Sequence, residues 1–111
     1  AFATDDIFAT VEILKSIGFK TLAISPNYYD DLYARLGLDS DLLERLAAND
    51  ILYDRDDFGE YFQVYSRNYG EGFFFEIIER KGGYDGYGAA NAQFRIAAQK
   101  RQLRTKGMPR K

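Results

Sequence analysis

Glu76 is the side chain of this sequence with the clearest chemical potential, because it lies inside the most apolar run of the chain, residues 73–80. Side chains of a strand alternate between the two faces of a sheet, so Glu76 would share one face with Phe74 and Ile78. Both faces of this run are apolar, which predicts a central strand buried on both sides. A buried carboxylate must be compensated by a cation, a proton, hydrogen bonds or a metal ion. The run itself leaves open both a salt bridge to an arginine such as Arg67 and ligation of a metal ion.

Gln63 is the second candidate, and it lies on a predicted neighbouring strand, residues 61–67. Its face of that strand also carries Tyr61 and Tyr65, and the opposite face is apolar. If the polar face points into the same cavity as Glu76, then Gln63 could hydrogen-bond a bound substrate. The alternative is an ordinary polar residue on a solvated face, and the sequence leaves both interpretations open.

A glycine-rich loop at residues 82–88 precedes a predicted helix, as phosphate-binding loops do. Its spacing matches neither the dinucleotide-binding fingerprint nor the P-loop, and no Lys-Ser or Lys-Thr pair follows it. We therefore expect a lid or a connector, in which glycine permits backbone angles that other residues avoid.

Composition narrows the class of protein further. The 111 residues suffice for one domain, and the net charge of −2 argues against a strong electrostatic drive toward nucleic acid. The chain contains no Cys and no His, which excludes disulfides, thiolate chemistry and histidine-based catalysis within it. No apolar run approaches the ~20 residues that span a bilayer, and no secretory signal pattern is present, so we predict a cytoplasmic protein without a membrane partner.

The elements that would position these residues form a β-α-β-β-β unit of the α+β class. The sequence opens without Met, as though within a strand, which suggests a fragment of a longer chain. Residues 1–104 are expected to form one module, with a helix capped by Thr4 or Asp5, and residues 105–111 a flexible tail. The predicted strands are 1–3, 19–24, 51–55, 61–67 and 73–80, and the predicted helices are 5–17, 27–36, 39–48 and 89–103. Such an open sheet usually closes by pairing with a second copy, so we also expect a homo-oligomer.

The run Phe-Phe-Phe-Glu-Ile-Ile-Glu-Arg at residues 73–80 resembles a segment of 4-hydroxyphenylpyruvate dioxygenase, a member of the vicinal oxygen chelate superfamily. Gly-Tyr-Gly-Ala-Ala-Asn at residues 86–91 extends the likeness, and Tyr28-Tyr29 and residues 51–54 support it. The resemblance covers nearly the whole chain. It implies β-α-β-β-β modules that close a half-barrel around a divalent metal, Fe(II) in the dioxygenase, held by two His and one Glu.

The resemblance also implies roles for individual residues. Glu76 falls on the metal ligand, the substrate pocket would include Gln63, Tyr65 and Asn91, and the lid that closes it would include Gly86, Gly88 and Ala92. No residue is assigned a catalytic role. Both His ligands would come from the rest of the polypeptide, so the chain alone is not expected to be active.

Two departures point to a more specific relative. Ala92 stands where the dioxygenases have a phenylalanine that packs on the substrate ring, and Tyr65 stands where they usually have another phenylalanine. Residues 51–56 and 82–91 are more similar to the dioxygenase-like domain of bacterial proteins that join it to a sugar-phosphate isomerase-like TIM barrel. Those barrels are implicated in the dehydration of 3-dehydroshikimate to protocatechuate.

Three functions therefore remain open. The first is an Fe(II)-dependent, dioxygenase-like domain that acts on a 2-oxo acid or a related small organic acid. The second is a companion domain in a 3-dehydroshikimate dehydratase that depends on a divalent metal, with Mg, Mn or Co as alternatives to iron. The third is a structural or dimerising module in which Glu76 forms only a salt bridge.

Overall fold

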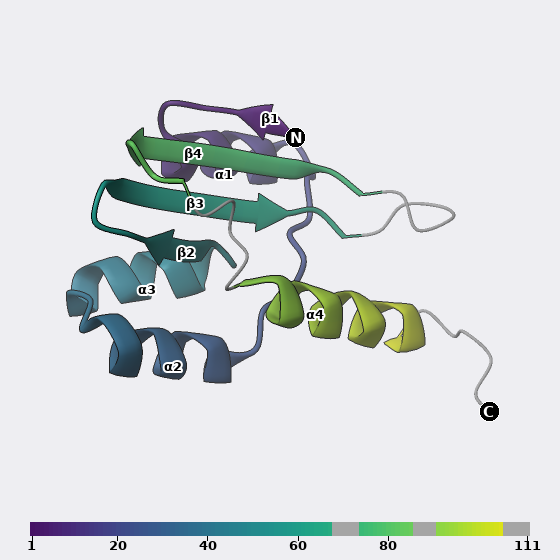
Figure 1. Cartoon of the computed structure of the whole chain (residues 1–111). Coiled ribbons are helices and arrows are strands. Elements are labelled where there is room, and N and C mark those ends of the chain that lie inside the picture. Colours follow the sequence, from purple (N-terminus) through teal and green to yellow (C-terminus); the bar gives the residue numbers. More distant parts are fainter. Residues whose placement is uncertain (68–73, 86–90, 106–111) are drawn as a thin grey trace.

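The computed structural model describes residues 1–67, 74–85 and 91–105 of the chain (Figure 1). Over these residues it has the predicted α+β architecture, a sheet with helices packed against it. The elements, in chain order, are β1 (Phe2–Ala3), α1 (Ile7–Ser16), α2 (Pro26–Leu36), α3 (Ser40–Ala48), β2 (Leu52–Arg55), β3 (Gly59–Tyr65), β4 (Glu76–Gly82) and α4 (Ala92–Thr105).

The described strands form one sheet in the order β1-β4-β3-β2. β1 runs parallel to β4, and the other two pairs are antiparallel. β4 is therefore an internal strand, as predicted for the run around Glu76. In the register of β3 and β4, Tyr65 lies opposite Glu76 and Gln63 lies opposite Ile78. Because residues that face each other across a pair share one face of the sheet, Gln63, Tyr65 and Glu76 lie on the same face.

The helices α1, α2 and α3 bury the other face of the sheet and the β2 edge. Their contribution to the core includes Ile7 and Val11 of α1, which pack with Val64 and Ile77 of the sheet. α4 packs against α2, where the centre of the Phe94 ring lies 5.0 Å from that of the Tyr28 ring, and it lies below the end of β3 in the view of Figure 1. Among the described residues, no helix is long and apolar enough to cross a membrane.

Three helix boundaries follow directly from local chemistry. Ser25 caps α2 through its side chain, and Pro26 occupies the first turn, where its missing N–H costs nothing. Asp39 caps α3, as the sequence predicts, by accepting hydrogen bonds from the backbone N–H groups that begin this helix. Gly37 ends α2 with φ of 62°, a left-handed angle that glycine adopts without steric penalty.

The predicted strand at residues 19–24 is wrong. Thr21 forms an isolated bridge to Ser66 just beyond the end of β3, flanked by backbone hydrogen bonds from Leu22 N–H to the Tyr65 carbonyl and from Arg67 N–H to the Lys20 carbonyl, and no regular strand extends from it. Asp50 explains why the pairing stops, because its carboxylate accepts hydrogen bonds from the Thr21 hydroxyl and from the Ile24 backbone N–H. A backbone donor bound by a side chain is not available to a neighbouring strand.

The prediction that both faces of residues 73–80 are buried is also wrong. The strand begins at Glu76, and residue 73 lies outside the described residues. Ile77 and Glu79 are buried on the helix-covered face, whereas Glu76 and Ile78 are only half-buried on the other face. The fully buried carboxylate of this strand is therefore Glu79, at 5% exposure, and not Glu76.

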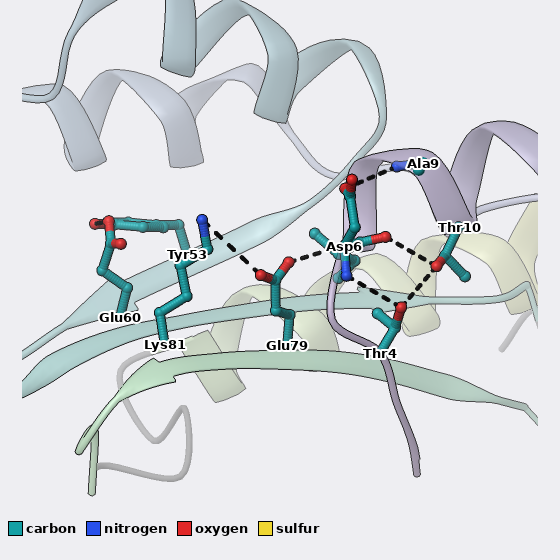
Figure 2. Close-up of polar contacts among 9 residues, drawn as sticks. Thr4, Asp6, Ala9, Thr10, Tyr53, Glu60, Glu79 and Lys81 are labelled. Atoms are coloured by element: carbon teal, nitrogen blue, oxygen red, sulfur yellow. Dashed lines mark hydrogen bonds and ion pairs between the residues drawn. The ribbon is translucent and has the colours of Figure 1, made fainter.

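Glu79 is compensated by the start of helix α1 and by Lys81, as Figure 2 shows. Its Oε1 accepts a hydrogen bond of 2.8 Å from the backbone N–H of Ile7 at the start of α1, and Lys81 Nζ lies 3.9 Å from its Oε2. A carboxylate is stabilised at this end of a helix, where the dipole is positive. The side-chain cap of α1 is Asp6, which accepts from Ala9 N at 3.1 Å, so the prediction of Thr4 or Asp5 is wrong.

Candidate functional site

Glu76, Gln63 and Tyr65 form a hydrogen-bonded group on the face of the sheet that α1 and α3 do not cover. Gln63 Nε2 donates to Glu76 Oε2 at 3.1 Å and to the Tyr65 hydroxyl oxygen at 2.9 Å. The Tyr65 hydroxyl in turn donates to the same Glu76 Oε2 at 3.1 Å. Both donors thus hold one oxygen of the carboxylate, and Oε1 accepts no hydrogen bond from the described residues.

A buried chain of hydrogen bonds continues from this group to the edge of the sheet. Asn91 Nδ2 donates to Gln63 Oε1 at 2.9 Å, and the Tyr28 hydroxyl lies 2.7 Å from Asn91 Oδ1. The same hydroxyl accepts from the backbone N–H of Tyr53 and lies 2.8 Å from its carbonyl oxygen. A satisfied network of this kind fixes the side chains that belong to it, because each broken bond would leave a buried polar atom without a partner.

The elements that meet here explain why the network forms. β3 supplies Gln63 and Tyr65 by strand alternation, β4 supplies Glu76 in register, and α2 projects Tyr28 over the unpaired edge of β2. Asn91 immediately precedes α4, so its contacts also fix where that helix starts. Gln63 is 3% exposed and Asn91 is 1% exposed, and the interpretation of Gln63 as a polar residue on a solvated face is therefore wrong.

The structure does not contain the predicted salt bridge from Glu76 to Arg67. Arg67 is exposed, and no ion pair joins it to Glu76. Glu76 is held by the amide of Gln63 and the phenol of Tyr65, both of which are neutral donors. No cationic side chain of the described residues forms an ion pair with Glu76.

The protonation of Tyr65 supports this arrangement. Burial raises the pKa of Tyr65 above its ordinary value, and the negative charge and hydrogen bond of Glu76 raise it further. The positive charge of Arg95 acts in the opposite direction on the same pKa. Tyr65 is consequently a proton donor to Glu76 throughout the neutral pH range.

Arg95 is the residue at this site that sequence reasoning missed. It is half-buried on α4, and its guanidinium carbon lies 5.6 Å from the centre of the Tyr65 ring. Its position four residues after Asn91 could have been the signal, because residues four apart lie on the same face of a helix. Further along the same sheet face, Tyr61 stacks on Tyr84 with ring centres 4.9 Å apart.

The residues of this chain fit part of a metal site and not the whole of one. The described residues contain no group of three or more His, Cys, Asp or Glu side chains that could hold a metal ion, and the sequence contains no His. Glu76 fits as a single carboxylate ligand, since Oε2 is oriented by two donors while Oε1 is not engaged by the described residues. A complete site requires ligands from elsewhere.

Some predicted residues are placed by the structure and others are not. Gln63, Tyr65, Asn91 and Glu76 are brought together as the resemblance implies. Ala92 begins α4, directly after Asn91. Gly86, Gly88 and residues 106–111 lie outside the described residues.

Comparison with known proteins defines the class to which this module is similar. No protein-family model matches the chain. The 4-hydroxyphenylpyruvate dioxygenase of Pseudomonas aeruginosa is 36% identical over 93 residues, which is 82% of this chain and 26% of that protein. A solved 4-hydroxymandelate synthase mutant from Streptomyces coelicolor has a TM-score of 0.75 at 32% identity and covers 90% of the chain. The chain is thus a 4-hydroxyphenylpyruvate dioxygenase-like module.

The more specific likeness is to larger two-part proteins. The 3-dehydroshikimate dehydratase of Pseudomonas putida is 54% identical over 99 residues, which is 88% of this chain but only 16% of that protein. A solved xylose isomerase-like TIM barrel/4-hydroxyphenylpyruvate dioxygenase fusion protein has a TM-score of 0.82 at 52% identity and covers 88% of the chain. The predicted resemblance to the dioxygenase-like domain of such fusions is confirmed. The chain spans about one sixth of their length, 16% in each case.

Proposed function

We propose that this chain is the dioxygenase-like domain of a larger, metal-dependent enzyme that acts on a 2-oxo acid or a related small organic acid. The observation that carries the proposal is the orientation of Glu76, whose Oε2 is held by Gln63 and Tyr65 on the face of the sheet opposite α1. Neutral donors that hold one carboxylate oxygen are the usual outer contacts of a metal ligand. A carboxylate held only for stability would more often meet an arginine or a helix end, as Glu79 does.

The proposed roles follow from the contacts of each side chain. Glu76 would contribute one ligand to a divalent metal, with Fe(II) as the first candidate and two His ligands supplied by the rest of the polypeptide. When bound, Fe(II) would supply the redox chemistry with O2. Gln63 orients Glu76 through one amide hydrogen and is itself oriented by Asn91, and a substrate at this face would lie against both side chains.

A second function is favoured by the names of the most similar curated relatives. Proteins that are 54% and 50% identical to the chain are 3-dehydroshikimate dehydratases, and the chain corresponds to 16% of each. In that case the dehydration belongs to the barrel, and this domain is a metal-binding companion, with Mg, Mn or Co as alternatives to iron. The departures Tyr65 and Ala92 agree with a pocket that has lost its aromatic specificity.

The proposed partner of the domain is the remainder of its own polypeptide. An apolar groove of about 310 Å³ beside β1 supports this, since it is lined by Phe2, Leu14 and Phe75 among others. We further propose a cytoplasmic homo-oligomer in which residues 1–104 form the module. Light scattering on the intact protein tests the oligomeric state.

Two assays on the intact protein separate the proposed functions. Oxygen uptake with 4-hydroxyphenylpyruvate or another 2-oxo acid, in the presence of Fe(II), supports the dioxygenase. Protocatechuate formation from 3-dehydroshikimate without oxygen uptake supports the companion domain. The variant Glu76→Gln should abolish oxygen uptake, and Glu44→Gln, an exposed position on α3, is the matched control. If Glu76→Gln, like the control, leaves the metal content and both activities unchanged, the domain is structural.

A further inference from the structure

Arg95 is a half-buried cation next to the proposed site, and among the described residues its charge is not matched by an ion pair. Its guanidinium carbon lies 5.6 Å from the centre of the Tyr65 ring, which is a cation–π contact. Within residues 1–67, 74–85 and 91–105, no Asp or Glu side chain forms an ion pair with it. An arginine that is partly buried without a carboxylate partner loses part of its hydration free energy. The arrangement is therefore suited to a negatively charged ligand.

Tyr65 connects this cation to Glu76. Its hydroxyl donates to Glu76 Oε2 at 3.1 Å, while Arg95 lies against its ring. Both charges act on the pKa of the Tyr65 hydroxyl, Glu76 to raise it and Arg95 to lower it, so both lie within Coulombic range of that group. A carboxylate that could hold a metal and a guanidinium that could hold an anion thus flank the same tyrosine.

We propose that Arg95 binds a carboxylate group of the organic acid that occupies the site at Glu76, and that it thereby selects acids over their neutral analogues. This inference rests on the proposed function, in which a small organic acid is the substrate. The guanidinium presents several N–H donors in a planar fork that matches the two oxygens of a carboxylate. Contact with the Tyr65 ring, at 5.6 Å from the guanidinium carbon to the ring centre, holds Arg95 beside the proposed site.

Arg80 is the other arginine on this face of the sheet, and it is a weaker candidate. It is exposed, and its guanidinium lies over the Tyr61 ring, which stacks on Tyr84. Arg80 is also four residues along β4 from Glu76, which places it about 13 Å away along the strand. Arg95 is closer to the Gln63–Tyr65–Glu76 group and is better shielded from water, where a charge-assisted hydrogen bond is stronger.

Calorimetric titration of the intact, metal-loaded protein tests the inference. The probes are pyruvate, 4-hydroxyphenylpyruvate and 3-dehydroshikimate, with pyruvamide as the neutral analogue of pyruvate. Arg95→Gln should weaken binding of the acids roughly 10- to 100-fold and leave pyruvamide unchanged, because charge-assisted hydrogen bonds are lost. Arg35→Gln, which removes the same charge from an exposed pair on α2, should change nothing.

The outcomes separate this inference from the proposed function. Equal affinity of the wild type and Arg95→Gln for all three acids, or no binding of any of them by the wild type, overturns the role of Arg95. Metal content tests the proposed function independently, because Arg95→Gln should retain metal whereas Glu76→Gln should lose it. If Arg95→Gln does not fold, Arg95→Lys keeps the charge without the planar fork and should still weaken binding of the acids. A purely structural role of Arg95 would lower the melting temperature and leave selectivity for acids over pyruvamide intact.

Discussion

Asn91 Nδ2 donates to Gln63 Oε1 at 2.9 Å, and this contact connects α4 to the centre of the sheet. Both residues are almost completely buried. Through Gln63 the contact reaches Glu76, and through the Tyr28 hydroxyl it reaches the edge of β2. The position of α4, and of Arg95 upon it, is thereby coupled to the orientation of the proposed metal ligand.

Tyr28→Phe should destabilise the protein by about 1–3 kcal/mol, because it leaves buried polar atoms of Asn91 and Tyr53 without a partner. The substitution keeps the aromatic ring and its packing on Phe94, so the loss of stability is due to the missing hydroxyl alone. Urea denaturation measures the change, and Tyr33→Phe at an exposed position is the control. Equal stability of the two variants would contradict the role given to the network.

Tyr65→Phe should lower the affinity for a divalent metal roughly 10-fold, because one of the two donors that orient Glu76 is removed. The substitution keeps the shape of the ring and its contact with Arg95. Competition with a metal chelator measures the affinity. An unchanged metal affinity would mean that the Gln63 amide alone orients the carboxylate.

Glu79→Ala should cost about 1–3 kcal/mol of stability without loss of metal, because Glu79 Oε1 accepts the Ile7 N–H at the start of α1. Glu79→Gln should cost less, since the amide oxygen can accept the same hydrogen bond. Thermal unfolding and metal analysis of the same samples check both parts. Loss of metal from either folded variant would show that Glu79, and not Glu76 alone, belongs to the site.

The buried tyrosines predict how stability depends on alkaline pH. Burial raises the pKa of Tyr28, Tyr29, Tyr53 and Tyr65 above the ordinary value of about 10. Because the unfolded chain releases these protons at lower pH than the folded protein, this stability is fully present below about pH 10 and is lost as pH rises further.

Absorbance at the tyrosinate band follows this titration directly. We expect the ionisation of the four buried tyrosines to coincide with unfolding. In concentrated denaturant, all nine tyrosines of the sequence should titrate together. Early ionisation of every tyrosine in the folded protein would contradict the burial described here.

Strand alternation and helix capping were sufficient to predict much of this fold. The pairing of residues 51–55 with 61–67 and the internal position of the strand at Glu76 follow from local pattern, and Asp39 and Gly37 follow from the chemistry of helix ends. The prediction of a strand at residues 19–24 failed because the Asp50 carboxylate accepts the hydrogen bond of the Ile24 backbone N–H. This contact joins residues that are distant in sequence. The prediction that Glu76 lies on a fully buried face failed because apolar content alone does not show which side of a strand the helices cover.

Part of the candidate site could also be predicted from strand alternation and from the resemblance. Period-two alternation places Gln63 and Tyr65 on one face, and the resemblance adds Asn91 and Glu76. The hydrogen bonds of Tyr28 could not be assigned from the sequence, because they depend on where α2 meets the sheet, and for Arg95 the spacing from Asn91 was the only local signal. The buried role of Glu79 depends likewise on the packing of α1 against β4.

Metal analysis of the intact protein tests the central claim most directly. Wild-type protein should carry a stoichiometric divalent metal after loading and desalting, Glu76→Gln should carry almost none, and Glu44→Gln should match the wild type. This result is expected because Glu76 is the carboxylate that Gln63 and Tyr65 orient through hydrogen bonds to Oε2. Full metal content in a folded Glu76→Gln protein would contradict the account.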